Sequence, residues 1–122
     1  KGLKEQNKDM TPEQLVNSTK FAQVAAQIGE LAIQVEAARV LTYQAAATVD
    51  RGAADVTLAA MAKITATDAA MKVSTEAMSI LGMAGLKPEL LLERIFRDAK
   101  AGQIYEGTNQ IQRMLIGRDL IK

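Results

Sequence analysis

The residues that could do chemistry in this 122-residue chain are mainly carboxylates, because it contains no histidine and no cysteine. These absences rule out thiolate nucleophiles, imidazole bases and the usual zinc sites. A carboxylate is then the best general base that remains. One of them, Glu106, lies just before a helix start at Thr108, where the helix dipole would keep it ionised. From position alone, a solvent-exposed charge that complements the dipole is favoured over a general base.

The composition limits the function classes. Hydrophobic residues make up 48% and charged residues 24%, as in an ordinary globular domain. The 15 basic and 14 acidic residues nearly balance, which argues against nucleic acid as a partner. No apolar run approaches the ~20 residues that span a bilayer. The polar start, Lys1 to Asp9, is unlike a signal peptide, and its first residue, lysine, hints at a truncated or processed chain. The lack of cysteine fits a reducing compartment.

The elements that must position these residues are all helical. Residues 1–10 are expected to be a flexible leader, and residues 11–122 a single domain. Thr11 and Gln14 form the pattern of a capping box, so a long helix is predicted from Thr11 to about Thr48. Apolar residues then follow at helical spacing, which predicts one buried face: Val24, Ile28, Leu31, Val35 and Ala38.

Three more helices are predicted after a turn at residues 50–52. Asp55 would cap the second helix, which Gly82 and Gly85 end. The third runs from about Pro88 to Ala101 and is broken by Gly102, and the last starts near Thr108. No segment alternates as a strand would, so the fold class is all-α. Short connections favour an antiparallel (up-down) four-helix bundle.

A resemblance to a known family rests on two segments near the C-terminus. Residues 93–100 (ERIFRDAK) followed by 104–113 (IYEGTNQIQR) resemble the C-terminal signature of acyl-CoA dehydrogenases. Residues 31–47 and 59–63 resemble the first and second long helices of the same domain. The resemblance therefore extends from about Phe21 to Lys122. It implies the C-terminal helical bundle domain of a longer enzyme, whose N-terminal helical and middle β-domains are absent from this sequence.

The resemblance also implies a reaction and its residues. The family removes hydrogens from the α and β carbons of a saturated acyl-CoA with FAD as cofactor. Glu106 matches the catalytic base, and a bound acyl chain that excludes water would make it a stronger one. Thr108, also the expected cap of the last helix, and Gln110 match contacts to FAD. Arg97 and Asp98 are interpreted as a structural ion pair.

The implied partners are an acyl-CoA substrate, an electron-transferring flavoprotein and further copies of the chain in a dimer or tetramer, with no nucleic acid or membrane. The fragment alone is expected to be inactive. The implied location is the bacterial cytoplasm, or the mitochondrial matrix in a eukaryote.

One segment departs from the family pattern. Residues 79–86 (SILGMAGL) have serine in place of glutamine and methionine in place of the second glycine. Gly82 remains a candidate contact to the FAD of a neighbouring subunit, although an ordinary helix-ending glycine is an equally good interpretation. Two alternatives stay open: a non-catalytic helical oligomerisation module, and an acyl-CoA oxidase or flavin monooxygenase of the same fold.

Overall fold

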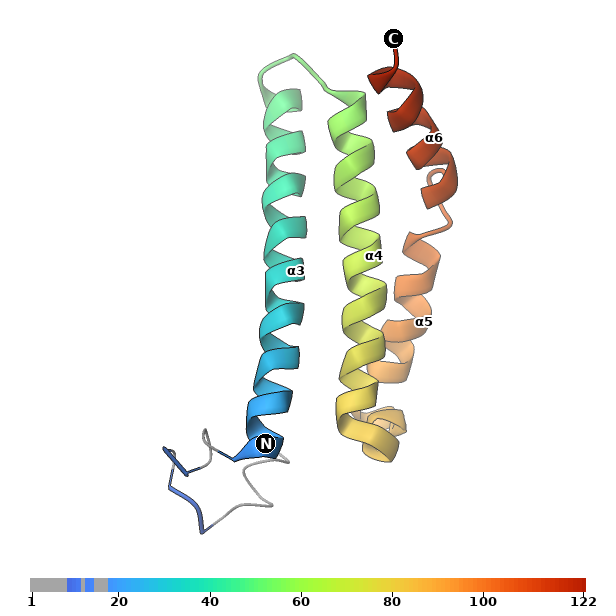
Figure 1. Ribbon diagram of the computed structural model, residues 1–122. Coiled ribbons are helices and arrows are strands. Elements are labelled where there is room, and N and C mark those ends of the chain that lie inside the picture. The colour runs from blue at the N-terminus through green and yellow to red at the C-terminus, as the bar shows by residue number, and fades with distance from the viewer. Residues whose placement is uncertain (1–8, 12, 15–17) are drawn as a thin grey trace.

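The computed structural model describes residues 9–11, 13–14 and 18–122, and within them all regular structure is helical (Figure 1). This confirms the all-α class. The leader predicted for residues 1–10 lies almost entirely outside the described residues. The elements are α3 (Thr19–Asp50), α4 (Val56–Leu81), the 3₁₀ turns η1 (Gly82–Leu86) and η2 (Pro88–Leu90), α5 (Leu92–Gly102) and α6 (Asn109–Leu120).

The helix α4 is the centre of the arrangement. α3 runs antiparallel along one side of α4, while α5 and α6 follow one another along the other side (Figure 1). Each extensive contact between the described α-helices involves α4. These contacts do not establish a closed four-helix bundle.

The first long helix begins later than the sequence predicts. The capping box exists: the backbone N–H of Gln14 donates to Thr11 Oγ1 at 3.2 Å, and that of Thr11 donates to Gln14 Oε1 at 3.0 Å. However, α3 starts at Thr19, where Ser18 Oγ accepts a hydrogen bond from the backbone N–H of Phe21 at 3.3 Å. Two cap signals stand close together, and the second one begins the long helix.

The predicted start and end of α4 are confirmed. Asp55 Oδ1 accepts from the backbone N–H of Leu58 at 2.8 Å, as a helix cap does. At the other end Gly82 has φ of +58°, a conformation that ends a helix easily only when the residue lacks a Cβ. The turn predicted at residues 50–52 is present, with Gly52 at φ +70°.

The third helix is shorter than predicted, and its ion pairs are not the predicted one. Leu91 adopts a left-handed conformation with φ of +58°, which separates η2 from α5. Arg97 pairs with Glu93 at 2.9 Å, and Asp98 pairs with Arg94 at 3.6 Å. The predicted Arg97–Asp98 pair was therefore wrong, since side chains one residue apart on a helix do not face each other, whereas those four apart do.

The helix α5 ends at Gly102, one residue after the predicted end at Ala101. An added Cβ would lie 3.1 Å from Thr67 Cγ2, so this glycine permits α5 to approach α4 closely. The buried apolar core of the described residues is also built from small side chains. The apolar residues buried in the described part are all alanines: Ala38, Ala45, Ala60, Ala62 and Ala69.

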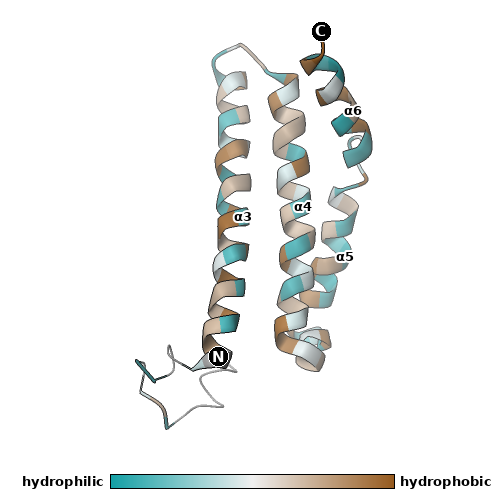
Figure 2. Ribbon diagram, viewed as in Figure 1, coloured by the Kyte–Doolittle hydropathy of each residue, from teal (hydrophilic) through white to brown (hydrophobic). Residues whose placement is uncertain are grey.

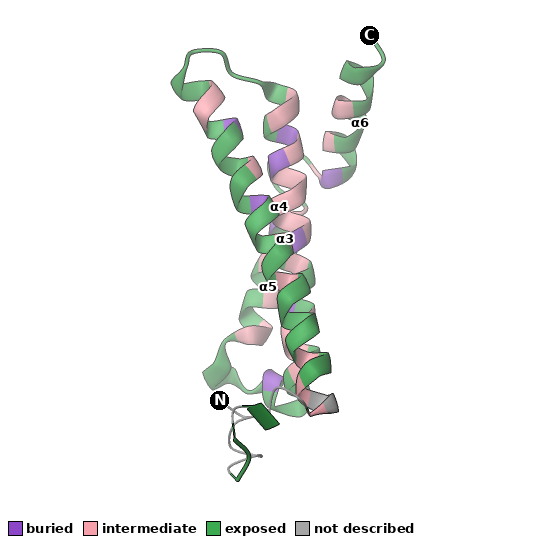
Figure 3. Ribbon diagram, turned by 60° about the vertical axis from the view of Figure 1, so that its left-hand side comes forward, coloured by how far each residue is buried: buried purple, intermediate pink, exposed green. Residues whose placement is uncertain are grey.

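Large apolar side chains remain exposed, most of all on α3 (Figures 2 and 3). Ile28 and Val35, predicted on the buried face, are 54% and 39% exposed, because α4 covers only part of that face. Across the described residues no helix combines the length and apolar character needed to cross a membrane.

Candidate functional site

The loop between α5 and α6, residues 103–108, carries the candidate base. Glu106 is exposed and has φ of +55°, and Gly107 follows with φ of +86°. A left-handed backbone costs a residue with a Cβ about 1–2 kcal/mol. Such strain persists only where the surrounding structure enforces it, and it is concentrated at functional sites. The conformation of Glu106 therefore needs a cause in the neighbouring side chains.

Two side chains hold the backbone of this turn. Gln112 Nε2, from α6, donates to the carbonyl oxygen of Glu106 at 3.0 Å. Lys63 Nζ, from α4, donates to the carbonyl oxygen of Gly107 at 2.8 Å. The φ angle of Gly107 favours glycine, and a Cβ there would lie 2.7 Å from Gln112 Nε2, so a larger residue would also displace the Gln112 side chain from its hydrogen bond.

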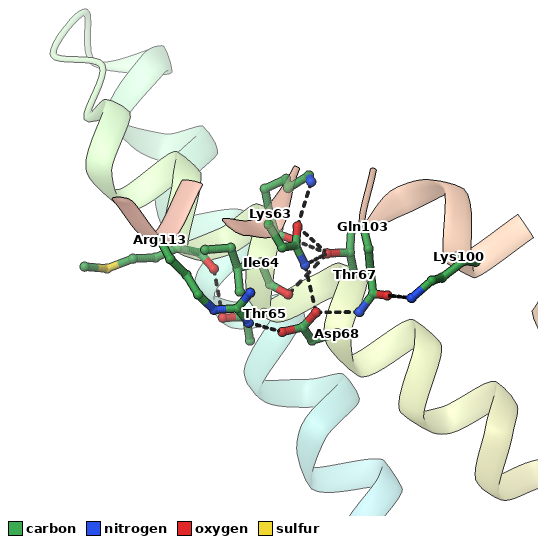
Figure 4. A network of polar contacts seen from close by, with 10 residues as sticks. Lys63, Ile64, Thr65, Thr67, Asp68, Lys100, Gln103 and Arg113 are labelled. Carbon is green, nitrogen blue, oxygen red and sulfur yellow. Dashed lines mark hydrogen bonds and ion pairs between the residues drawn. The ribbon is translucent and has the colours of Figure 1, made fainter. Parts of the chain in front are cut away.

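A polar network connects α4 with both ends of the loop (Figure 4). Its members are Lys63, Thr67, Asp68, Gln103, Asn109 and Arg113.

Asp68 is the acceptor at its centre: Oδ1 receives hydrogen bonds from Gln103 Nε2 and Asn109 Nδ2, both at 2.7 Å, and Oδ2 receives one from Arg113 at 2.6 Å. Burial alone would raise the pKa of Asp68, but these hydrogen bonds outweigh it and lower the pKa below its usual value.

Asn109 is the most deeply buried member, with 2% of its surface exposed. Its amide group donates to Asp68 and to Thr67 Oγ1, the latter at 2.9 Å, while its Oδ1 accepts from Lys63 at 2.7 Å. Its backbone N–H also donates to the carbonyl oxygen of Gln103 at 3.0 Å, which closes the loop on itself. A buried amide satisfied in this way fixes its surroundings, because any displacement would leave polar groups unpaired.

Of the predicted cofactor residues, Thr108 is the last residue of the loop that carries Glu106, and Gln110 follows it in α6. Thr108 is the predicted cap of α6, and its Oγ1 accepts from the backbone N–H of Ile111 at 3.3 Å. Gln110 is exposed and is the second residue of α6. An open, mainly polar cavity of about 390 Å³ lies here. It is lined by Asp68, Lys100, Gln103, Ile104, Thr108, Asn109, Gln110 and Arg113.

Gly82 lies apart from these residues. It follows the far end of α4, roughly 28 Å along the helix axis from Lys63. A Cβ built on Gly82 would meet no described atom within 4 Å. Gly82 therefore ends α4. Its contact with a cofactor stays a prediction, and that contact would lie far from the Glu106 loop of the same chain. In the described part of the chain no three acidic side chains gather as metal ligands.

Lys63 and Asp68 were not predicted as site residues. Both lie in the alanine-rich stretch of α4, and a charged residue on the half-buried face of such a helix is a signal that it has a partner elsewhere. The identity of that partner could not be derived, since Asp68 and Asn109 are far apart in the sequence. The segment 104–113 gave no sign that Asn109 would be buried.

Comparison with known proteins places the chain in a family. Residues 14–121 match the family described as acyl-CoA dehydrogenase, C-terminal domain. The chain therefore belongs to the acyl-CoA dehydrogenase family and corresponds to its C-terminal domain. It is 47% identical over 95 residues to cyclohexane-1-carbonyl-CoA dehydrogenase of Geobacter metallireducens, covering 78% of this chain and 25% of that protein. It thus spans about a quarter of the length of that relative.

Solved structures agree with this assignment. The structure of butyryl-CoA dehydrogenase from Megasphaera elsdenii matches with a TM-score of 0.81 and 43% identity, covering 84% of this chain and 27% of that one. The FAD complex of PigA matches with a TM-score of 0.78 and 29% identity, covering 83% of this chain and 26% of that one.

Proposed function

We propose that this chain is the part of a FAD-dependent acyl-CoA dehydrogenase that supplies the catalytic base, and that the base is Glu106. The observation that carries the proposal is the geometry of the loop. An exposed carboxylate is held in a strained left-handed turn by Gln112 and Lys63, next to the N-terminus of α6. A carboxylate that only complemented the helix dipole would need no such restraint.

The reaction removes a proton from the α-carbon and a hydride from the β-carbon of a saturated acyl-CoA. Glu106 takes the proton on its carboxylate, and the new double bond forms as the hydride leaves. FAD, when bound, supplies the acceptor for that hydride. Closure of the site around an acyl chain removes water from Glu106, which strengthens the base at the moment of proton transfer.

The residues beside Glu106 fit one edge of a flavin. The Thr108 hydroxyl accepts from Ile111 and still has its own hydrogen to donate. Gln110 exposes an amide that can donate and accept, and the N-terminus of α6 favours an electron-rich partner. These groups would hold ring carbonyls or a pyrophosphate. The cavity of about 390 Å³ is too small for a whole dinucleotide, so other parts of the protein would complete the site.

Assembly is the second part of the proposal. Exposed apolar residues on α3, among them Ile33 at 66% and Val40 at 57%, would be covered by another helix or another subunit. Contact through this face would give a dimer or tetramer, while the four α-helices of this chain would form the antiparallel four-helix bundle. Gly82, remote from Glu106 in its own chain, would then contact the FAD of a neighbouring subunit.

The remaining proposals rest on family membership. An electron-transferring flavoprotein would accept the electrons, and the protein would act in the bacterial cytoplasm or, in a eukaryote, the mitochondrial matrix.

The test uses the full-length protein purified with FAD and mixed with saturated acyl-CoA without oxygen. We expect the oxidised flavin band to bleach in wild type and in the control Glu89→Gln, whose carboxylate lies in η2, and to persist in Glu106→Gln. Glutamine keeps the shape but cannot take a proton. Equal bleaching in all three proteins would move the base elsewhere.

A non-catalytic assembly module is the second candidate, favoured by the apolar surface of α3. No bleaching in wild type across several chain lengths would support it. An oxidase or monooxygenase of the same family would instead bleach and then consume oxygen.

A further inference from the structure

The loop that carries Glu106 is fastened to α4 at both of its ends. Asp68 Oδ1 accepts from Gln103 at the start of the loop and from Asn109 just after it, at 2.7 Å in each case. Lys63 Nζ joins the turn of the loop to the residue after it, because it donates both to the carbonyl oxygen of Gly107 and to Asn109 Oδ1. Two charged residues one and a half turns apart on α4 therefore fix where the loop begins, turns and ends.

These contacts bear on the direction of the Glu106 side chain. The left-handed backbone at Glu106 and Gly107 is intrinsically unfavourable for the first of these residues. It is kept by hydrogen bonds to the two carbonyl oxygens, of which one comes from Lys63 and the other from Gln112 on α6. Since α6 is itself joined to Asp68 through Arg113 and Asn109, both restraints depend on α4.

We propose that Lys63 and Asp68 are positioning residues for Glu106, which hold the loop so that its carboxylate points at the reacting carbon. The inference rests on the proposed function. Neither residue donates to or accepts from the Glu106 carboxylate in the described structure, so both act through the backbone and through Asn109. Because catalysis by a positioned base is sensitive to shifts of about 1 Å, losing either residue should slow the proton transfer more than it weakens binding.

The first readout is independent of activity. In the full-length protein, hydrogen exchange is measured at the backbone amides of Tyr105 and Asn109, which donate to Ala101 and Gln103. We expect exchange to be at least about tenfold faster in Lys63→Met and in Asp68→Asn, because the loop opens more often. The controls are Lys72→Met, on the exposed side of α4, and Asp50→Asn, at the end of α3; both should exchange as wild type does. Unchanged exchange in Lys63→Met and Asp68→Asn would overturn the proposal.

The second readout separates positioning from general damage. At saturating acyl-CoA, the rate of flavin reduction should fall about 10- to 100-fold in both variants, with KM changed less than about threefold. In a Glu106→Gln background the same substitutions should cause no further loss of the residual rate, since there is no base left to position. A similar loss in that background would show a merely structural role and refute the inference.

Separate controls distinguish a loss of folding from a loss of function. Flavin content and melting temperature identify a variant that fails to fold, and Arg113→Gln, which removes one of the three donors to Asp68, then serves as the milder variant. Arg113→Gln should speed hydrogen exchange at the Asn109 amide and slow flavin reduction, each by less than Asp68→Asn does. No change in either rate would overturn the proposal. If wild type itself is not reduced by any acyl-CoA, the proposed function fails and the catalytic role fails with it. The exchange result would still show whether α4 holds the loop.

Discussion

Gly107 is the position where the structure makes its sharpest energetic prediction. Its φ of +86° is disfavoured for any residue with a Cβ, which costs about 1–2 kcal/mol in the folded state. The Cβ of alanine would also lie 2.7 Å from Gln112 Nε2. Gln112 is a long side chain that can move away, but it then gives up its hydrogen bond to Glu106, which is worth about 1 kcal/mol. Gly107→Ala should therefore destabilise the fold by about 2–3 kcal/mol.

The assay is urea denaturation followed by circular dichroism at one fixed protein concentration, because any self-association would make stability depend on concentration. Gly117→Ala is the matched control. Gly117 lies within α6, and an added Cβ would meet nothing within 4 Å. Alanine is the better helix former there, by about 1 kcal/mol, so this variant should be more stable than wild type.

The two substitutions thus add the same methyl group and should shift stability in opposite directions. If Gly107→Ala loses less than about 0.5 kcal/mol, the left-handed turn is not enforced by its neighbours, and Glu106 is not held under strain. If Gly117→Ala is destabilising by a similar amount to Gly107→Ala, the effect at Gly107 is not specific to the loop.

Three further predictions concern the network, a cap and the surface. The pKa of Asp68 is lowered from 3.8 in the folded state, so its contribution to stability is present above that pH and is lost as the pH falls through the lower folded value. The difference in free energy of unfolding between wild type and Asp68→Asn, from urea denaturation, should be largest at neutral pH and shrink in that acidic window. A difference that grows as the pH falls would contradict the lowered pKa.

Asp55→Ala removes the cap of α4, so it should lower the free energy of unfolding by about 1 kcal/mol in the same assay and speed hydrogen exchange at the Leu58 amide. Unchanged exchange at Leu58 would contradict this prediction. The 122-residue chain alone should associate and bind FAD only weakly, and Val40→Lys on the exposed face of α3 should reduce association in light scattering. A monodisperse wild-type monomer at high concentration, or a yellow purified fragment, would refute these expectations.

The features of the fold that the sequence predicts well are local ones. Asp55 and Thr108 each accept from a backbone N–H three residues later, so the cap residue and its partner stand together in the sequence. Gly82 ends a helix through its own backbone conformation. The start of α3 was mistaken because two caps, Thr11 and Ser18, compete within a few residues, and local pattern cannot decide between them.

The features that escaped prediction depend on contacts between distant segments or on strain. Leucine gives no sign of a left-handed conformation, yet Leu91 adopts one and shortens α5. The strained turn at Glu106 could be suspected only from its neighbour, Gly107. The resemblance pointed to Glu106, Thr108 and Gln110 but not to what holds them, because Asp68 and Lys63 meet the loop only after the chain has folded back along α4.

The way the loop is held follows from the small core of the domain. The buried apolar side chains among the described residues are alanines, which permit close packing of the helices but contribute little buried area each. The apolar side chains of the loop at residues 103–108 are exposed, Ile104 by 58% and Tyr105 by 59%, so the loop gains little from apolar burial in this chain. Directional hydrogen bonds accepted by Asp68 and donated by Lys63 take the place of apolar burial, and they specify one geometry more narrowly than apolar contacts would. The proposed base, Glu106, would gain from this arrangement, because its position then depends on α4 within its own chain rather than on the surfaces that other parts of the protein would cover.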